Sequence, residues 1–339
     1  MKAAVLFAPG DLRITDFPAP PLADDAVEVA VAYCGLCGTD FHKFAGKAGS
    51  RPVTYPVPLG HEASGVVTRV GEKVTRFKAG DRVTVDPNHS CGRCDYCRSG
   101  RRHLCTNSRG VVKGMAEFIC PPEENVHHIP DTLSLRNAAL TEPLSCCLHG
   151  MDLMEMKSGE TVAIVGCGAI GALMVQLCRI SGAGKIIVLD ANEDKRQVAM
   201  SLGAHLFINS RTEDVSAVLE AAGVSCIHRV MECVGIPVTA SLALSIAGRG
   251  ATVVLFGVSD PEAIVPLKWY EAFTKELVIK TSYINPDTTP RAIALLSGGA
   301  IDTDAAISTV IPPEALLDEM QTRKYSVLGK VLVKIKDFE

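Results

Sequence analysis

The stretch TVAIVGCGAIGALMVQLCRISGAGKIIVLD, residues 161–190, decides the fold. It opens with an apolar strand (161–165), passes through the glycine loop GCGAIG (166–171) into an apolar helix, and ends in a second strand closed by Asp190. Glycines at a strand-to-helix turn let a pyrophosphate approach the helix N-terminus, whose dipole favours an anion. An acid about twenty residues further on accepts hydrogen bonds from ribose hydroxyls. The stretch therefore predicts a dinucleotide-binding unit.

Asp190 also bears on which dinucleotide is bound. Its carboxylate would repel a 2′-phosphate, so NAD is favoured over NADP. Lys195 and Arg196 follow shortly afterwards and keep NADP as the alternative. A second interpretation of the loop is that its glycines only allow the helix to pack closely on the strand.

Strands and helices alternate throughout residues 157–283. Apolar strands are predicted at 161–165, 185–189, 205–208, 227–231, 251–256 and 277–280, and helices at 169–181, 193–202, 212–222 and 238–247. This order indicates an α/β domain with a doubly wound parallel sheet.

Residues 1–144 have a different pattern. Short alternating apolar runs at 27–32, 63–70 and 81–85 are separated by turn residues and predict an all-β fold. Towards the end of the chain we expect one helix (290–296) and a final strand (329–335). Because 339 residues exceed what one hydrophobic core usually serves, two domains are expected.

Composition excludes several classes of protein. The net charge of −4 offers no excess of positive charge to bind nucleic acid or an anionic membrane. The longest apolar run, 162–178, is interrupted by glycines and is interpreted as a buried strand, turn and helix, not as a membrane span. The apolar run before Pro9 is too short for a signal peptide, so a cytoplasmic protein is expected.

Cysteine usage points to a metal. In a reducing compartment, a dense cluster within thirteen cysteines indicates a metal site before disulfides. The segment CGRCDYCRSGRRHLC, residues 91–105, contains Cys91, Cys94, Cys97 and Cys105 but too few apolar residues to form a core. Four thiolates would hold one zinc ion with no open position, which is a structural site. A redox-labile or solvated loop is the alternative.

A second set of metal-binding residue types precedes this segment. Cys37 lies in CGTDFH, and His61 and Glu62 follow in LGHEASG. A thiolate, an imidazole and a carboxylate leave one position open on zinc, as in a catalytic site. The alternatives are that Cys37 is a small core residue and that His61 is a hydrogen-bonded histidine on a strand. A C-x2-C pair of Cys34 with Cys37 is a further alternative.

The order of these motifs resembles the zinc-dependent medium-chain alcohol dehydrogenases over nearly the whole chain. The shared pieces are GHEASGVVTRVG (60–71), FKAGDRV (77–83), the four-cysteine segment, EPLS (142–145), the glycine loop and GKVLV (329–333). Glu62 directly after His61, and Glu142 before Pro143, resemble the sorbitol (polyol) and threonine dehydrogenase branch. The resemblance implies a GroES-like β-barrel catalytic domain completed by the C-terminal segment, with a Rossmann NAD-binding domain inserted.

That implied organisation divides the chain at defined residues. The catalytic domain comprises residues 1–147 and 286–339, with the structural zinc lobe at 88–108, and the Rossmann domain comprises residues 148–285. The resemblance also implies a homo-oligomer, either a dimer or a tetramer through the edge of the Rossmann sheet.

The resemblance assigns roles to individual residues. Cys37, His61 and Glu62 hold the catalytic zinc, and Glu142 is a nearby or exchangeable ligand. Thr39 takes the proton of the zinc-bound alcohol, the cofactor ribose relays it to His42, and His42 passes it to solvent. The implied cofactor contacts are Gly166, Gly168, Ile170, Gly171, Asp190, Lys195, Phe256, Gly257, Val258, Ser282 and Tyr283.

These observations predict a zinc- and NAD-dependent oxidoreductase with two zinc ions per subunit, which reversibly oxidises a secondary alcohol of a polyol or sugar-derived substrate. Ser282 stands where polyol members often carry arginine, which argues against ordinary sorbitol specificity. Lys43 and Lys47 either favour an acidic or phosphorylated substrate or are solvated. Alternatives are a threonine or simple secondary-alcohol dehydrogenase, a nucleotide-binding zinc or redox sensor, and a zinc-ribbon nucleic-acid binder.

Overall fold

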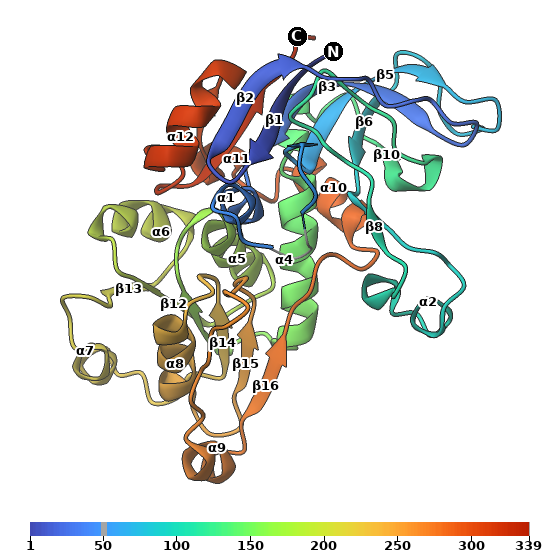
Figure 1. Cartoon of the computed structure of the whole chain (residues 1–339). Helices are drawn as coiled ribbons and strands as arrows, with labels where there is room; N and C mark the ends of the chain where they lie inside the picture. Colours follow the sequence, from blue (N-terminus) through green and yellow to red (C-terminus); the bar gives the residue numbers. More distant parts are fainter. Residues whose placement is uncertain (49–52, 339) are drawn as a thin grey trace. The chain divides into compact units, whose positions relative to one another are not determined.

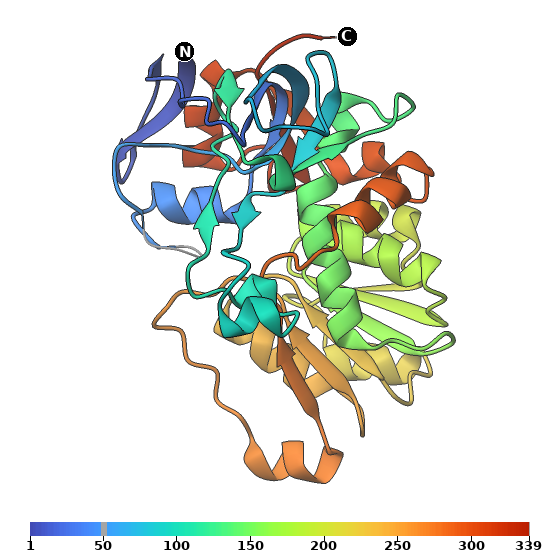
Figure 2. The same cartoon turned by 90° about the vertical axis from the view of Figure 1, so that its right-hand side faces the viewer.

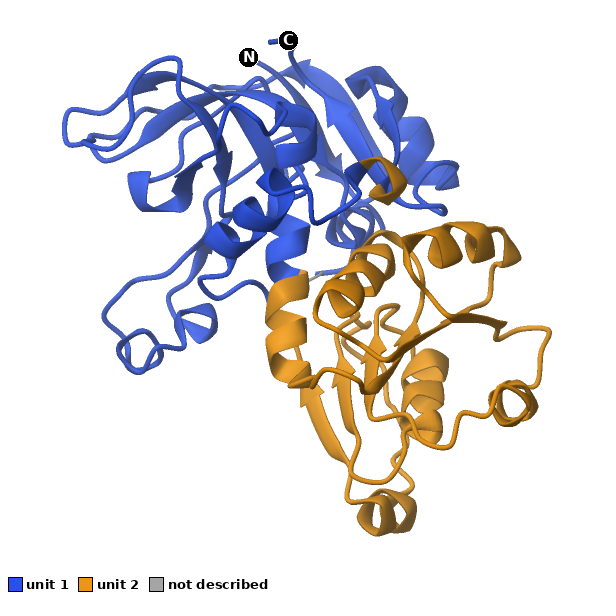
Figure 3. Ribbon diagram, turned by 180° about the vertical axis from the view of Figure 1, so that it is seen from behind, with its two compact units in different colours: residues 1–146, 284–303, 307–339 blue, residues 147–283, 304–306 orange. Residues whose placement is uncertain are grey.

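The computed structural model describes residues 1–48 and 53–338, which form two compact units (Figure 3). Unit 1 comprises Met1–Cys146, Ile284–Thr303 and Ile307–Glu339, and unit 2 comprises Cys147–Tyr283 and Asp304–Ala306. Among the described residues, no helix has both the length and the apolar character that crossing a membrane requires.

Unit 2 is built on a six-stranded sheet in the order β13-β12-β11-β14-β15-β16, with every neighbouring pair parallel (Figure 1). Its strands are β11 (Thr161–Val165), β12 (Lys185–Asp190), β13 (Leu206–Asn209), β14 (Arg229–Glu232), β15 (Thr252–Leu255) and β16 (Val278–Thr281). The order reverses at β11, so the predicted doubly wound sheet is confirmed.

Helices connect these strands. They are α5 (Ala169–Ile180), the 3₁₀ turn η3 (Glu193–Lys195), α6 (Arg196–Leu202), α7 (Val215–Ala221), α8 (Pro237–Ile246) and α9 (Trp269–Lys275). The central strands are buried on both faces, as β11 illustrates with four of its five residues buried. Such strands form continuous apolar runs, which is why the sequence pattern located them.

Unit 1 is mostly β-structure in three sheets. The largest has the order β10-β6-β5-β3-β18-β17, with β9 on β3, and smaller sheets have the orders β2-β1-β4 and β7-β8. The strands are β1 (Lys2–Ala8), β2 (Asp11–Asp16), β3 (Val27–Gly35), β4 (Val57–Pro58), β5 (Glu62–Val70), β6 (Arg82–Val85), β7 (Asn88–His89), β8 (Arg109–Gly110), β9 (Phe118–Ile119), β10 (Val126–His128), β17 (Ile307–Ile311) and β18 (Lys330–Lys334).

The C-terminal strand β18 completes the N-terminal sheet. It pairs antiparallel with β3, so that Leu332 faces Gly35, and parallel with β17. Strand β3 is buried along its whole length because it has neighbours on both edges and packs on the core. Residues almost 300 positions apart therefore meet at the ends of β3 and β18.

The prediction that residues 1–144 are all-β is wrong, because this part of the chain also contains helices. This part contains α1 (Gly38–Phe44), α2 (Asp95–Arg98), α3 (Leu135–Ala138), the start of α4 (Thr141–Met154), and the 3₁₀ turns η1 (Arg102–Leu104) and η2 (Glu123–Asn125). The three short helices have seven residues or fewer, which is too short for an apolar repeat of 3.6 residues. The remaining elements, α10 (Thr289–Ser297), α11 (Thr303–Ala306), η4 (Pro313–Ala315) and α12 (Leu316–Thr322), lie towards the C-terminus.

Candidate functional site

In unit 1, sheet pairing brings Cys37, His61 and Glu62 together. Strands β3 and β5 pair antiparallel with Gly35 opposite Glu62, so the residues just after β3 lie beside those at the start of β5. One ligand atom from each of the three side chains lies within 4.8 Å of those of the other two. Among the described residues this set does not include Cys34, which is buried within β3, or Glu142.

Asp40, which was not predicted from the sequence, anchors the backbone next to two members of this set. It is fully buried on α1, where one carboxylate oxygen accepts the backbone N–H of Cys37 at 3.1 Å. The other accepts the N–H of Gly60 at 3.2 Å and lies 3.8 Å from Nδ1 of His61. Asp40 is the third residue of α1 and bonds back to Cys37, the residue before the helix, which is a capping pattern. The spacing Cys37-x-x-Asp40 was therefore the feature of the sequence that could have indicated its role.

Lys330 is the second residue that sequence reasoning missed. Its Nζ lies 2.6 and 2.8 Å from the two carboxylate oxygens of Glu62 and 3.2 Å from the carbonyl oxygen of Leu36. Both side chains are almost completely buried, 4% exposed for Lys330 and 1% for Glu62. Burial, the largest single effect, disfavours the charge on Lys330, but Glu62, Cys37 and Glu142 together outweigh it and raise the pKa of the lysine.

Two further groups are perturbed at this site. Burial, followed by the charge of Glu62, raises the pKa of the Cys37 thiol to about 11. Burial also raises the pKa of Glu142 to about 8, although His61 counteracts this effect. Glu142 lies in the first turn of α4 and interacts electrostatically with all three members of the set. A buried carboxyl with a raised pKa beside a thiol and an imidazole is typical of a functional site.

The donor set fits a zinc ion. Sulfur, imidazole nitrogen and carboxylate oxygen are the ligand types that zinc takes, and three protein ligands leave a fourth position for substrate. Thr39 and His42 lie on α1 next to Cys37, three residues apart and therefore on one side of the helix, and both are partly exposed. The backbone N–H of Thr39 also bonds to the sulfur of Cys37 and lowers its pKa.

The four-cysteine set is also assembled. The sulfur of Cys94 lies 3.5 Å from that of Cys97 and 3.8 Å from that of Cys105, which in turn lies 3.5 Å from that of Cys91. Four sulfurs at Zn–S distances of about 2.3 Å stand about 3.8 Å apart in a tetrahedron, so these positions fit a zinc ion. All thirteen cysteines are free of disulfides, and backbone N–H groups of Arg93 and Cys94 lower the pKa of Cys91 to about 6.

In unit 2, the glycine loop has the geometry of an anion-binding turn. Gly166 has a φ of 93°, which only glycine adopts readily, and a Cβ on Gly171 would lie 1.9 Å from the carbonyl oxygen of Gly166. A Cβ on Gly168 would meet nothing within 4 Å. Gly166 therefore allows the turn, and Gly171 allows the helix to pack closely on it. Gly168 leaves open space for a pyrophosphate at the start of α5, beside Ile170.

Asp190 ends β12 next to this loop. Its carboxylate accepts the N–H of Cys167 at 2.7 Å and that of Asn192 at 2.9 Å, and lies 3.1 Å from Nζ of Lys195. The structure thus brings Asp190 and Lys195 together at the carboxyl end of the sheet. The lysine charge offsets some of the repulsion that the aspartate would exert on a second phosphate.

The remaining predicted contacts lie at the same edge of the sheet. Phe256, Gly257 and Val258 directly follow β15, and Ser282 and Tyr283 directly follow β16. In parallel sheets the carboxyl ends of the strands meet at one edge, where ligands bind. All five residues are at least partly exposed.

Glu232, at the end of β14, was not identified from the sequence. It is 1% exposed, and one of its oxygens accepts the N–H groups of Val234 and Gly235 and the hydroxyl of Thr239, at 2.7 to 2.9 Å. Glu232 thereby fixes the loop that contains Val234. This loop contacts Gly166, because a Cβ added to Gly166 would lie 2.3 Å from Val234. An acid at the end of a buried strand was the only available indication.

Comparison with known proteins agrees with this geometry. The family model described as "Alcohol dehydrogenase GroES-like domain" matches residues 23–131, and "Zinc-binding dehydrogenase" matches residues 169–298. The sorbitol dehydrogenase of Bacillus subtilis (strain 168) is 32% identical, covering 95% of this chain and 93% of that protein. The D-arabitol-phosphate dehydrogenase of Enterococcus avium is 33% identical, covering 92% and 91%.

A solved structure extends the similarity to the fold. A zinc-binding dehydrogenase from Sinorhizobium meliloti 1021 bound to NADP has a TM-score of 0.91 and 36% sequence identity, covering 98% of this chain and 99% of that one. Both units of the present chain therefore have counterparts in one known protein.

Proposed function

Because the chain belongs to the zinc-dependent medium-chain alcohol dehydrogenases, in the branch of the sorbitol (polyol) dehydrogenases, we propose that it oxidises a secondary alcohol of a polyol or sugar-derived substrate reversibly to a ketone, with NAD as hydride acceptor. The observation that carries this proposal is the set of Cys37, His61 and Glu62, whose donor atoms lie within 4.8 Å of one another. The substrates in the names of the two relatives support a polyol.

Each residue of the metal centre has a separate task in this proposal. Cys37, His61 and Glu62 would hold zinc, which when bound withdraws electron density from the substrate oxygen and makes the hydroxyl more acidic. Asp40 orients His61 and Cys37, and Lys330 fixes the carboxylate of Glu62. Glu142 remains a nearby or exchangeable ligand in the proposal.

Proton removal falls to α1. The hydroxyl of Thr39 would accept the proton of the substrate hydroxyl as it gives up its own, and the imidazole of His42 would release that proton to solvent. Both side chains are partly exposed on one side of the helix. A nicotinamide dinucleotide, when bound, would supply the hydride acceptor for the carbon that carries the substrate hydroxyl.

The choice of NAD rests on Asp190. An ionised carboxylate at the end of the second strand favours a free ribose over a 2′-phosphate. The pairing with Lys195 at 3.1 Å weakens this preference, and the relative from Sinorhizobium meliloti was crystallised with NADP. The ratio of kcat/KM for NAD to that for NADP measures the preference directly.

The experiment that tests the proposal follows NADH absorbance with a panel of sugar alcohols, inositols and β-hydroxy amino acids. A polyol is the expected substrate, and turnover confined to threonine or to simple secondary alcohols would assign the chain to those enzymes instead. Cys37→Ser is expected to abolish turnover while the protein remains folded. Full activity of this variant after metal removal would refute the mechanism.

A zinc count separates the enzyme from a non-enzymatic class. Two zinc ions per chain support the dehydrogenase, with the second held by Cys91, Cys94, Cys97 and Cys105. One ion, confined to the four cysteines, supports a nucleotide-binding sensor without catalysis. We also propose a reducing, cytoplasmic compartment for the working protein, because the four clustered cysteines are arranged to bind a metal ion as thiolates.

A homo-oligomer is also part of the proposal. Trp269, Tyr270 and Phe273 on α9 are 73 to 78% exposed, and β16 is an edge strand with Val278 and Ile279 exposed as well. Figures 1 and 2 both show α9 projecting beyond the ends of β15 and β16. Large exposed apolar groups beside an unpaired edge are typical of an interface, and a second copy of the chain supplies the complementary strand.

A further inference from the structure

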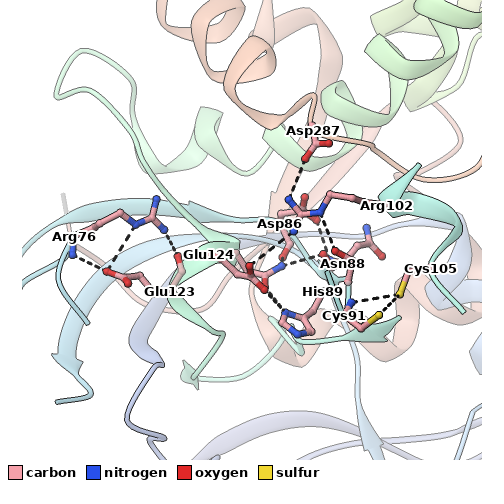
Figure 4. A network of polar contacts seen from close by, with 12 residues as sticks. Arg76, Asp86, Asn88, His89, Cys91, Arg102, Cys105, Glu123, Glu124 and Asp287 are labelled. Atoms are coloured by element: carbon pink, nitrogen blue, oxygen red, sulfur yellow. Dashed lines mark hydrogen bonds and ion pairs between the residues drawn. The ribbon is translucent and has the colours of Figure 1, made fainter. Parts of the chain in front are cut away.

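A polar network joins the four-cysteine segment to a distant part of unit 1. We call residues 88–105 the metal loop and residues 284–290 the return segment, because the latter leads the chain from unit 2 back into unit 1. Nδ2 of Asn88, at the start of the metal loop, donates to Oδ1 of Asn285 at 2.7 Å. Within the loop, the guanidinium of Arg102 lies 3.6 Å from Asp287 (Figure 4).

The backbone of Asn88 is fixed by hydrogen bonds to neighbouring residues. Its backbone N–H donates to the carboxylate of Asp86 at 2.9 Å, and its carbonyl oxygen accepts Nδ2 of Asn125 at 3.0 Å. Nε of Arg102 donates to Oγ of Ser90 at 2.9 Å, which ties Arg102 to the residue that directly follows β7. These bonds fix the backbone at Asn88, from which its side chain reaches Asn285.

The two contacts differ in strength. Asn285 is 3% exposed, so its hydrogen bond with Asn88 is shielded from water, and leaving a buried amide oxygen without a donor is costly. The side chains of Arg102 and Asp287 are 44% and 67% exposed, and ion pairs of that kind contribute little. The bond from Asn88 therefore carries most of the connection.

The return segment needs this support because its backbone is strained. Ile284 and Asp287 have φ values of 48° and 52°, in the left-handed region, which aspartate tolerates but a β-branched residue such as Ile284 rarely adopts. The conformation of Ile284 therefore persists only when neighbouring contacts impose it. Asn285, which bonds to the metal loop, directly follows this strained residue.

We propose that Asn88 and Arg102 let the metal loop position the chain that follows β16, and thereby Ser282 and Tyr283, for binding of the nicotinamide dinucleotide. Ile284 directly follows these two residues, so a fixed return segment limits the backbone positions open to them. Asn88 is then a positioning residue, and the four-cysteine site supports cofactor binding besides folding its own loop. The inference rests on the proposed function, which supplies the cofactor contacts.

Titration of the full-length protein with NADH, followed by fluorescence, tests this role. Asn88→Ala is expected to weaken NADH binding roughly three- to tenfold, as loss of one net hydrogen bond implies, and to raise KM for NAD more than it lowers kcat. Arg102→Ala is expected to have a smaller effect, about twofold. Arg98→Ala, a change at an exposed arginine of α2 in the same loop, is the matched control and is expected to leave affinity unchanged.

The double variant distinguishes positioning from general destabilisation. Since Asn88 and Asn285 form one bond, Asn88→Ala/Asn285→Ala is expected to weaken NADH binding no more than the worse single variant. Zinc content is expected to remain that of the unaltered protein. An Asn88→Ala protein with full zinc content and unchanged NADH affinity overturns the inference alone. An unaltered protein that binds neither NADH nor NADPH overturns it together with the proposed function.

Discussion

The buried pair between Lys330 and Glu62 provides a quantitative test of how unit 1 holds its metal centre. Lys330→Met leaves an unbranched side chain one atom shorter and removes the charge 2.6 Å from a carboxylate that is 1% exposed. Removing one partner of a buried ion pair leaves an uncompensated charge and typically costs 3–5 kcal/mol. In a unit of roughly 200 residues this loss lowers the melting temperature by about 10 °C.

The assay is differential scanning calorimetry of five proteins after zinc removal, namely the unaltered chain, Lys330→Met, Lys334→Met, Glu62→Gln and Glu62→Gln/Lys330→Met. Zinc is removed because Glu62 is also a proposed zinc ligand and metal binding stabilises the folded state. Lys334→Met is the matched control, since this lysine lies on the same strand but pairs with Asp337 at the surface. Its loss is expected to cost less than about 1 kcal/mol. In the double variant Glu62→Gln/Lys330→Met both charges are gone, so most of the stability lost in the single lysine variant is expected to return.

Two results would refute this reasoning. The first is a Lys330→Met protein no less stable than the Lys334→Met control. The second is a double variant whose loss equals the sum of the two single losses, since additive effects mean that the two side chains do not interact.

Four further changes have defined outcomes. Cys97→Ser is expected to lose one zinc ion and expose the metal loop to limited proteolysis, and an intact loop with full zinc content contradicts the structural site. Asp190→Ala is expected to lower the NAD-to-NADP ratio of kcat/KM about tenfold or more, and an unchanged ratio assigns the preference to another residue. Phe273→Glu is expected to reduce the molar mass found by light scattering if α9 lies in the oligomer interface; an unchanged oligomer rules that surface out. Burial raises the pKa of Asp86 to about 6. As the pH rises from about 4 to 6, the unfolded chain therefore loses this proton before the folded chain does, and the free energy of unfolding falls. The Asp86→Asn variant does not lose this stability. The difference between its free energy of unfolding in urea and that of the unaltered protein is therefore expected to rise by up to about 3 kcal/mol from pH 4 to pH 7.

Elements with strong local patterns were predictable. The strands of unit 2 are continuous apolar runs between helices, and the structure confirms their order and parallel direction. The short helices of unit 1 were missed because they have seven residues or fewer and therefore carry no apolar repeat. Helix α4 was missed as well, although Pro143 lies in its first turn, where proline is tolerated.

The sequence by itself determined the groups whose parts are close along the chain. The glycine loop and Asp190 belong to one strand–helix–strand unit, and the four cysteines fall within fifteen residues, so chain connectivity alone brings each group together. Only the tertiary structure decided that Lys330 faces Glu62, 268 positions away, and that Asn285 bonds to Asn88 across 197 positions. Those pairings depend on the register of β18 on β3 and on the path of the return segment, which are set by packing and backbone hydrogen bonds between distant segments and leave no local pattern in the sequence.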